Sequence, residues 1–155
     1  LRCLVGSEMC IRDSLNTTKV EFLSYFNKFN DALDLANKFL EISPKNYPLS
    51  ISKSQILLNM GQYFESEEII RDQLLRKNDS PDLWFMLSET QKTSQNIVGY
   101  HQSRAEYFLL LGQDEKALNQ LEFALQLTQN NFQVSDRIMT KIIEIKKSLQ
   151  NSRGL

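Results

Sequence analysis

His101 is the only histidine in this chain of 155 residues, and histidine is the side chain best suited to proton transfer or metal binding near neutral pH. It lies in the segment YHQSRAEYF, and a lone histidine cannot hold a metal unless carboxylate partners lie close by. We therefore predict that His101 packs rather than catalyses. The sequence also contains no HExxH, CxxC, GxxxxGK[ST] or GxSxG motif. These features predict no catalytic, cofactor-binding or metal-binding residue in this chain.

Two clusters of acidic residues are the next candidates for chemistry, because paired carboxylates can act as acid and base. They are Glu65, Glu67 and Glu68, and Asp114 with Glu115. Both clusters fall in the first turns of predicted helices, where negative side chains stabilise the positive end of the helix dipole. We expect this structural role and no paired-carboxylate catalysis.

The overall charge argues against two classes of partner. The chain has 18 basic and 19 acidic residues and a net charge of −1, which gives no electrostatic case for nucleic acid or an anionic membrane. Lys141, Lys146 and Lys147 are expected to face solvent rather than to form a polyanion site. The longest apolar run, Tyr107–Leu111, is far too short to span a membrane. We therefore predict no nucleic-acid partner and no membrane span.

The first residues of the chain match no predicted element. The two cysteines, Cys3 and Cys10, both lie there, so the remainder offers no disulfide and no thiol zinc cluster. A DNA string that encodes Leu4 to Asp13 in frame looks like the transposase mosaic-end adapter used to prepare sequencing libraries. We therefore expect residues 1–14 to be a non-native, adapter-derived segment, with the natural reading frame cut near Leu15.

Helical repeats account for the rest of the sequence. The segment Phe26–Asn46 aligns with Asn59–Asn78 and places Phe29 opposite Tyr63, 34 positions later. A third copy, Ala105–Leu127, carries small residues where two helices must approach closely and bulky residues that fill the adjacent holes. A period of 34 with this pattern resembles the tetratricopeptide repeat, a helix-turn-helix unit.

The spacing of the repeats predicts one additional helix. Gly61 and Gly112 occupy equivalent turns, yet they lie 51 positions apart, which is one and a half repeats. Ser80 and Pro81 supply an N-cap and a first helical residue within this interval. A helix that begins there accounts for the extra half-repeat.

These signals predict an all-α fold, a tetratricopeptide-repeat α-solenoid of about eight antiparallel helices. The expected helices are 17–26, 30–42, 47–60, 63–77, 81–94, 97–111, 114–128 and 132–150. The last helix covers the final repeat with an apolar stripe, formed by Ile138, Met139, Ile142, Ile145 and Leu149. Residues 15–150 make up the predicted repeat domain, and residues 151–155 a frayed tail.

A groove lined by the first helix of each pair is the candidate binding site. Such grooves bind extended peptides, and Asn and Gln amides contact the peptide main chain. The positions predicted to face inward are Glu21, Gln55, Asn59, Gln102 and Glu106. A plain solvent-exposed polar surface explains the same residues equally well. The partner predicted for the concave groove is a protein or peptide.

The segment Gly99–Lys147 resembles a narrower family. The features that carry the resemblance are HQSRAEY, the turn at Gly112, the stretch LNQLEFAL and a long amphipathic final helix, with SPDLWFMLSE half a repeat earlier. The chain looks like the C-terminal tetratricopeptide region of bacterial periplasmic zinc metallopeptidases of the beta-barrel assembly-enhancing protease type. The resemblance extends from Leu15 to Leu149.

This resemblance implies the C-terminal part of a secreted peptidase whose N-terminal HExxH domain binds zinc. That motif is absent here, so no zinc ligand or catalytic residue carries over, and the zinc would belong to the missing domain. The family also implies a periplasmic location and a role in outer-membrane protein quality control. Its repeats are expected to dock the outer-membrane assembly machinery, substrates or the chain's own peptidase domain. A stand-alone repeat adaptor with no enzymatic parent, and a cytoplasmic location, stay open as alternatives.

Overall fold

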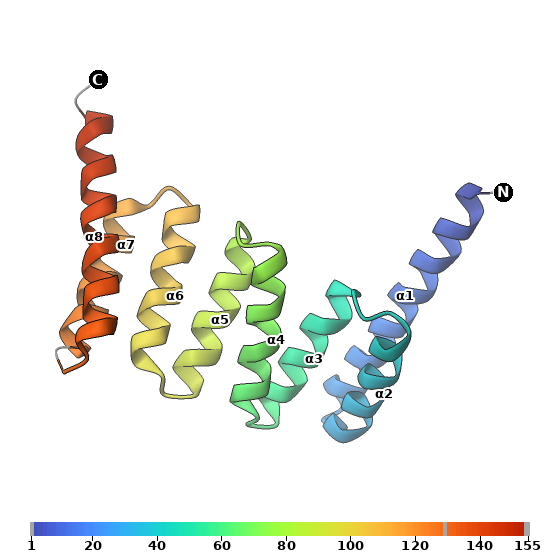
Figure 1. The fold of residues 1–155 in the computed structure, drawn as a ribbon. Helices are drawn as coiled ribbons and strands as arrows, with labels where there is room; N and C mark the ends of the chain where they lie inside the picture. Colours follow the sequence, from blue (N-terminus) through green and yellow to red (C-terminus); the bar gives the residue numbers. More distant parts are fainter. Residues whose placement is uncertain (1, 129, 154–155) are drawn as a thin grey trace. The chain divides into compact units, whose positions relative to one another are not determined.

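The computed structural model describes residues 2–128 and 130–153, and every regular element in them is an α-helix (Figure 1). The predicted all-α class is confirmed. The described residues form eight helices, α1 (Arg2–Tyr25), α2 (Phe29–Ile42), α3 (Tyr47–Asn59), α4 (Tyr63–Arg76), α5 (Pro81–Thr93), α6 (Ile97–Leu110), α7 (Asp114–Leu127) and α8 (Phe132–Arg153). The predicted limits of α2 to α7 agree with these bounds to within one residue.

The two terminal helices are longer than predicted. Helix α1 begins at Arg2 instead of residue 17, and α8 continues to Arg153 instead of ending at residue 150. The expectations of no element before residue 15 and of a frayed tail after residue 150 are therefore wrong for the described residues there. A nucleated helix extends by one hydrogen bond per added residue, and neither extension contains a proline that would stop it. Residues 154–155 of the predicted tail lie outside the described residues.

Four residues in the left-handed backbone conformation mark the turns within helix pairs. They are Asn27 (φ 58°), Gly61 (φ 78°), Gln95 (φ 62°) and Gly112 (φ 67°). The first three follow one another at intervals of 34 residues, and the fourth comes 17 residues after Gln95. The predicted extra half-repeat is thus confirmed, and its turn lies at Gln95, between the predicted helices 81–94 and 97–111.

The same pair of hydrogen bonds closes each of these turns. The Gly112 N–H donates to the carbonyl of Leu109 at 3.0 Å, and the next N–H, of Gln113, reaches back to Phe108 at 2.9 Å. Equivalent pairs of bonds form at the other three left-handed residues. This is the Schellman arrangement, which satisfies carbonyls at the end of a helix and requires one residue with positive φ. Each of these helix pairs is consequently joined by a turn of three residues.

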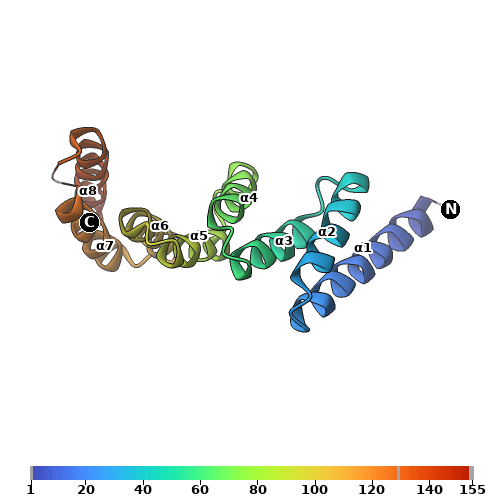
Figure 2. The ribbon, with the colours of Figure 1, turned by 90° about the horizontal axis from the view of Figure 1, so that it is seen from below.

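The chain divides into two compact units, residues 1–72 and 73–155, and α4 crosses the boundary. In the first unit, α1, α2 and α3 (Figure 2) share a core of buried residues, formed by Val20, Ala32, Ala36, Leu49 and Ile56. The two alanines of α2 are fully buried, which lets the neighbouring helices approach closely. Between α3 and α4, the buried Ser66 hydroxyl donates to the carbonyl of Ser54 at 2.8 Å.

The second unit has its core among α6, α7 and α8. The buried residues of this core are Ala105, Ala117, Leu121, Ala124, Ile138, Ile142 and Ile145. The predicted close-packing alanines and most of the apolar stripe of α8 are confirmed. Met139 is the exception, because it is 43% exposed. It directly follows Ile138, so it projects about 100° away from the stripe around the helix axis.

Candidate functional site

The groove residues predicted in the first unit form two exposed polar pairs. Glu21 on α1 accepts a hydrogen bond from the hydroxyl of Ser52 on α3 at 3.1 Å. Gln55 and Asn59, one helical turn apart on α3, join through their side-chain amides at 3.3 Å. All three predicted residues are therefore at the surface, and each already has a polar neighbour.

The two groove residues predicted in the second unit, Gln102 and Glu106, are half-buried and lie one turn apart on α6. The carboxylate of Glu106 forms an ion pair with Lys141 of α8. Lys146 of α8 pairs in the same way with Glu122 of α7, with 3.3 Å between nitrogen and oxygen. Lys146 faces solvent as expected, with its side chain 53% exposed, whereas Lys141 is half-buried. Both ammonium groups neutralise carboxylates on the helices that α8 covers.

Another side of α6 departs from the repeat pattern. In α2, α4 and α7, the residue five positions after the left-handed turn residue is small and fully buried, namely Ala32, Ser66 and Ala117. The residue nine positions after the turn is buried as well, namely Ala36, Ile70 and Leu121. At the same two positions after Gln95, α6 carries Tyr100 and Arg104, and neither is buried. A tyrosine and an arginine thus stand where the repeat otherwise buries small or apolar side chains.

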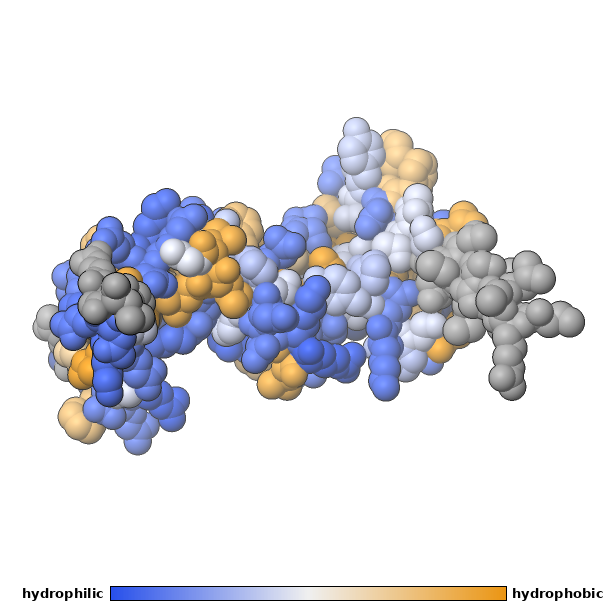
Figure 3. Space-filling model, turned by 90° about the horizontal axis from the view of Figure 1, so that it is seen from above, coloured by the Kyte–Doolittle hydropathy of each residue, from blue (hydrophilic) through white to orange (hydrophobic). Residues whose placement is uncertain are grey.

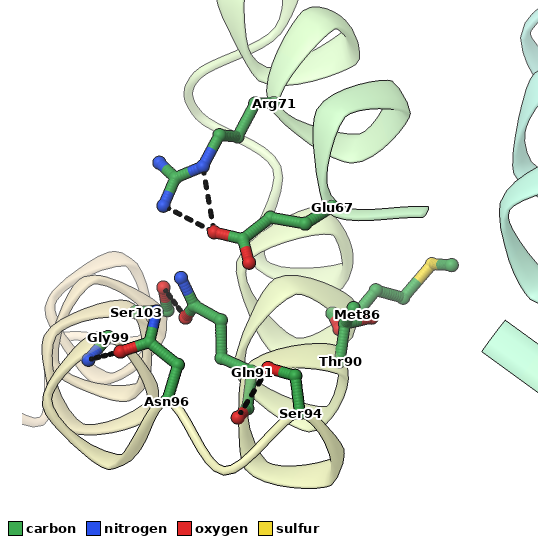
Figure 4. A network of polar contacts seen from close by, with 9 residues as sticks. All are labelled: Glu67, Arg71, Met86, Thr90, Gln91, Ser94, Asn96, Gly99 and Ser103. Carbon is green, nitrogen blue, oxygen red and sulfur yellow. Dashed lines mark hydrogen bonds and ion pairs between the residues drawn. The ribbon is translucent and has the colours of Figure 1, made fainter. Parts of the chain in front are cut away.

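Helix α6 packs against α5 and α7 and is joined to each of them by a turn with a left-handed residue, at Gln95 and Gly112. Towards α5 it presents Ser103, whose hydroxyl donates to the Gln91 side chain at 2.7 Å (Figure 4). Gly99 makes room for this contact, since a Cβ at Gly99 would lie only 2.8 Å from Nε2 of Gln91. Towards α7 and α8 it presents Ala105, which is fully buried in their common core. The residues between these two sides of α6 stay at the surface.

Arg104 lies among three aromatic rings. Its guanidinium carbon is 4.6 Å from the ring centre of Phe85 on α5, 5.1 Å from that of Tyr107 and 5.5 Å from that of Phe108. At these distances a cation is attracted to the face of an aromatic ring. The rings cover most of the arginine, whose side chain is 22% exposed. They therefore hold the guanidinium in one place between α5 and α6.

Arg104 is poorly satisfied as a hydrogen-bond donor. Its Nη1 atom is buried and has no hydrogen-bond partner among the described residues. The carboxylate of Glu89 on α5 lies 3.7 Å from Nη1, which is too long for a hydrogen bond. In the first unit, by contrast, Arg71 donates to Glu67 twice, at 2.9 and 2.6 Å (Figure 4). A guanidinium has five N–H donors, so Arg104 keeps capacity for a further acceptor.

The contacts between cations and rings continue along this side of α6 and onto α7. Lys92 lies over Tyr100 at 5.9 Å, and Lys116 lies over Phe108 at 5.6 Å. The ring of His101 contacts those of Tyr100 and Phe123, with centroids 4.9 and 5.5 Å apart. We call these two sets of contacts together the aromatic–cation face, formed by Phe85, Glu89 and Lys92 of α5, Tyr100, His101, Arg104, Tyr107 and Phe108 of α6, and Lys116 and Phe123 of α7.

His101 is held within this face by packing and by one hydrogen bond. Its Nδ1 atom lies 2.8 Å from Oε1 of Gln120 on α7, and an amide oxygen can only accept, so the ring nitrogen donates. No group of three or more His, Cys, Asp or Glu side chains in the described part of the chain is arranged to hold a metal ion. The contacts of His101 therefore assign it to the structure of the face.

Large hydrophobic side chains of the aromatic–cation face reach solvent, with Phe85 38% and Phe123 51% exposed. Figure 3 shows hydrophobic patches among the hydrophilic surface on one side of the molecule. Exposed rings beside an arginine have the composition of protein-binding surfaces, which are enriched in aromatic residues and Arg. Across the described residues, no helix is both long and apolar enough to cross a membrane.

Sequence reasoning missed this face because it assigned the binding surface from the regular repeat, and α6 does not follow the regular repeat. A usable signal was nevertheless present. Arg104 lies four residues after Tyr100, and Tyr107 and Phe108 lie three and four residues after Arg104. This spacing places the four side chains on one side of a helix.

Comparisons with known proteins agree with this fold. None of the protein-family models searched matches the chain. Over 120 residues the chain is 26% identical to the mouse (Mus musculus) interferon-induced protein with tetratricopeptide repeats 3, a match that covers 77% of this chain and 26% of that protein. The chain thus spans about a quarter of the length of this relative.

Two solved structures resemble the chain in fold. They are MamA from residue 41 to its end, of Desulfovibrio magneticus RS-1, and the MamA RS-1 ArsTM double mutant. Each has a TM-score of 0.57 and 13% sequence identity, and each match covers 88% of this chain and 76% of the other. Together with the spacing of the turns, these similarities define the class of the molecule, which is a helical-repeat protein of the tetratricopeptide type.

Proposed function

We propose that this chain is a protein-binding module that holds an extended segment of a partner protein on its helical surface. The observation that carries the proposal is the aromatic–cation face, where rings and cations are fixed by mutual contacts and still reach solvent. Ordered aromatic and arginine side chains dominate the energetics of protein interfaces. The predicted groove residues, which we call the polar groove, are further candidates within the same proposal, each within its own unit: Glu21, Gln55 and Asn59 in the first, and Gln102 and Glu106 in the second.

An array of immobilised extended peptides tests this proposal directly. The full chain, fluorescently labelled, should bind a subset of the peptides saturably, and a heat-unfolded sample should not. Gln102→Ala tests the groove and Phe85→Ala tests the aromatic–cation face, while Lys147→Ala, on the exposed side of α8, is the control. Weakened binding by either test variant supports the proposal and identifies the surface. If the folded chain binds no peptide saturably, the proposal is wrong.

We further propose that the parent protein is a periplasmic zinc metallopeptidase and that this module guides its substrates or docks it to the outer-membrane assembly machinery. The resemblance of Gly99–Lys147 to that family supports this part of the proposal. The segment SPDLWFMLSE, half a repeat earlier, belongs to the same resemblance. The described residues contribute no zinc ligands in this account, because the metal would belong to the peptidase domain.

The DNA upstream of the codon for Leu15 decides between this parent and the alternative, a stand-alone repeat adaptor. An in-frame HExxH domain behind a signal peptide supports the exported peptidase. A start codon immediately before Leu15, or a domain of another type, contradicts the peptidase and favours the adaptor, with a cytoplasmic location if no export signal is present. The same sequence also tests whether residues 1–14 derive from an adapter.

A further inference from the structure

We propose that the aromatic–cation face binds an acidic extended peptide, with a peptide carboxylate accepting hydrogen bonds from Arg104 and neighbouring apolar side chains resting on the exposed rings. This inference rests on the proposed protein-binding function and specifies the chemistry of the partner. It concerns α5, α6 and α7 of the second unit and is independent of the polar groove.

The first argument is the unused donor capacity of Arg104. Its buried Nη1 atom has no hydrogen-bond partner in the described part of the chain, and the Glu89 carboxylate stays at 3.7 Å. Because 22% of the side chain is exposed, a ligand can reach the guanidinium at its exposed N–H groups and not at Nη1. Leaving a charged donor short of acceptors is costly, so natural structures seldom keep one without a reason. A planar carboxylate matches the fork of a guanidinium and can accept two parallel hydrogen bonds from it.

The second argument is preorganisation. Three rings between 4.6 and 5.5 Å from the guanidinium carbon hold Arg104 in position before any ligand arrives. An arginine that is already ordered loses little side-chain entropy when it binds, whereas a free surface arginine loses much more. The flanking rings also lower the local polarity, which strengthens a hydrogen bond between opposite charges.

The third argument is the balance of charge on this face. Lys92 of α5, Arg104 of α6 and Lys116 of α7 each lie over an aromatic ring. Glu89 is the acidic side chain paired with Arg104, across 3.7 Å, and Asp114 and Glu115 precede Lys116 in the first turn of α7. On the side covered by α8, by contrast, Glu106 and Glu122 each have their own lysine. The loosely paired Arg104 is therefore the positive charge that this face offers to an anionic ligand.

The exposed aromatic rings of this face indicate which class of anionic ligand fits it best. Exposed Phe85 and Phe123 offer apolar area for aliphatic or aromatic side chains that flank an acidic residue. Single-stranded nucleic acid also combines negative charge with flat rings. Proteins that bind it, however, carry a run of cations that follows the nucleic-acid backbone. The net charge of the chain is −1, so the molecule as a whole does not attract a polyanion. An acidic, partly apolar peptide is therefore the ligand to test.

The test measures fluorescence anisotropy of a labelled peptide that alternates Phe with Asp and Glu, titrated with the full chain. A matched peptide with Asn and Gln in place of the acids, another with Lys, and a labelled single-stranded oligonucleotide complete the set of probes. Arg104→Gln should weaken binding of the acidic peptide by about tenfold, because it removes hydrogen bonds between opposite charges. Arg71→Gln, at an arginine already satisfied by Glu67, is the control and should leave the affinity unchanged.

Glu89→Gln is a second test variant, and its expected effect is the opposite one, a higher affinity for the acidic peptide. Such a gain cannot result from a disrupted binding surface. The substitution removes the carboxylate that competes for Arg104, so the acidic peptide should bind about twofold to fivefold more tightly. Circular dichroism of each variant verifies that its helical content and melting are those of the parent. Added salt should weaken binding of the acidic peptide, because it screens the attraction between exposed charges.

The outcomes separate this inference from the proposed function. Equal binding of the acidic and amide peptides, or unchanged affinity in both Arg104→Gln and Glu89→Gln, overturns the acidic-peptide inference and leaves the protein-binding function standing. Preferential binding of the oligonucleotide overturns the inference in favour of nucleic acid. Failure of the folded chain to bind any of the peptides, here and on the array, contradicts both.

Discussion

At the scale of single residues, the left-handed turn positions explain how short helices can follow one another with so few connecting residues. Two of the four positions are glycines, and the other two are Asn27 and Gln95. Glycine adopts positive φ without steric cost, asparagine does so with a small cost, and glutamine with a larger one. The sequence therefore predicted the turns at the glycines, while Gln95 carried no residue-type signal.

Gly112→Val should lower the free energy of unfolding by about 1–3 kcal/mol, since a β-branched residue is strained at positive φ. A Cβ at this position would meet no atom within 4 Å, so the cost would come from the backbone alone. Chemical denaturation followed by circular dichroism measures the change. Gly112→Asn should cost clearly less, and equal losses in the two variants would contradict the backbone explanation.

Gln95→Gly should raise the stability, by about 0.5–1 kcal/mol. The substitution relieves about 1–2 kcal/mol of left-handed strain and loses part of that gain to the greater freedom of glycine in the unfolded chain. Urea denaturation of the variant and parent measures the difference. Gln113→Gly, at the residue that follows the Gly112 turn, serves as the control and should not stabilise the chain; a lower stability of Gln95→Gly would show that the turn is not strained.

At the scale of elements, α6 is the helix that gives the second unit its distinctive surface. Helix α6 belongs to two helix pairs. The turn at Gln95 joins it to α5, and the turn at Gly112, only 17 residues later, joins it to α7. Its sides towards α5 and α7 are occupied by packing, which leaves Tyr100 and Arg104 at the surface. The half-repeat in the spacing is therefore the structural origin of the aromatic–cation face.

Gly99→Ala tests how closely α5 and α6 are matched. The added Cβ would lie 2.6 Å from Nδ2 of Asn96 and 2.8 Å from Nε2 of Gln91, so both side chains must move. Asn96 also caps α6 by accepting the Gly99 N–H at 3.0 Å, and that cap would be disturbed. We expect a loss of about 1–3 kcal/mol in chemical denaturation. An unchanged stability would mean that the two helices can separate freely at this point.

Much of the element structure could be predicted from the sequence, and the failures have physical reasons. Helices α2 to α7 were predictable because most of their ends carry a turn or cap signal, such as Gly61 or Pro81, and the spacing of the repeat covered the turn at Gln95, which has none. The ends of α1 and α8 were not, because helix propagation needs no side-chain signal once a helix has formed. The aromatic–cation face was not predicted for a third reason: it depends on which sides of α6 are already covered, and burial is a tertiary property.

At the scale of the whole molecule, each of the two units has a hydrophobic core of its own. Among residues 14–25 of α1, Val20 is fully buried and Thr17 is 8% exposed. Removing residues 1–14 should therefore leave the melting temperature of the chain unchanged in a thermal scan by circular dichroism. A clear decrease would show that the first turns of α1 stabilise the fold and would count against the adapter interpretation of this segment.

The central claim is that the second unit binds a partner through the aromatic–cation face, and a titration of the isotopically labelled full chain with the acidic peptide, followed by NMR, tests it most directly. We predict that the largest shifts of backbone and side-chain signals occur at Arg104 and at the neighbouring rings of α5, α6 and α7. The signals of the Glu106–Lys141 pair should change little. Shifts confined to the polar groove, or no saturable shifts at all, would contradict the claim.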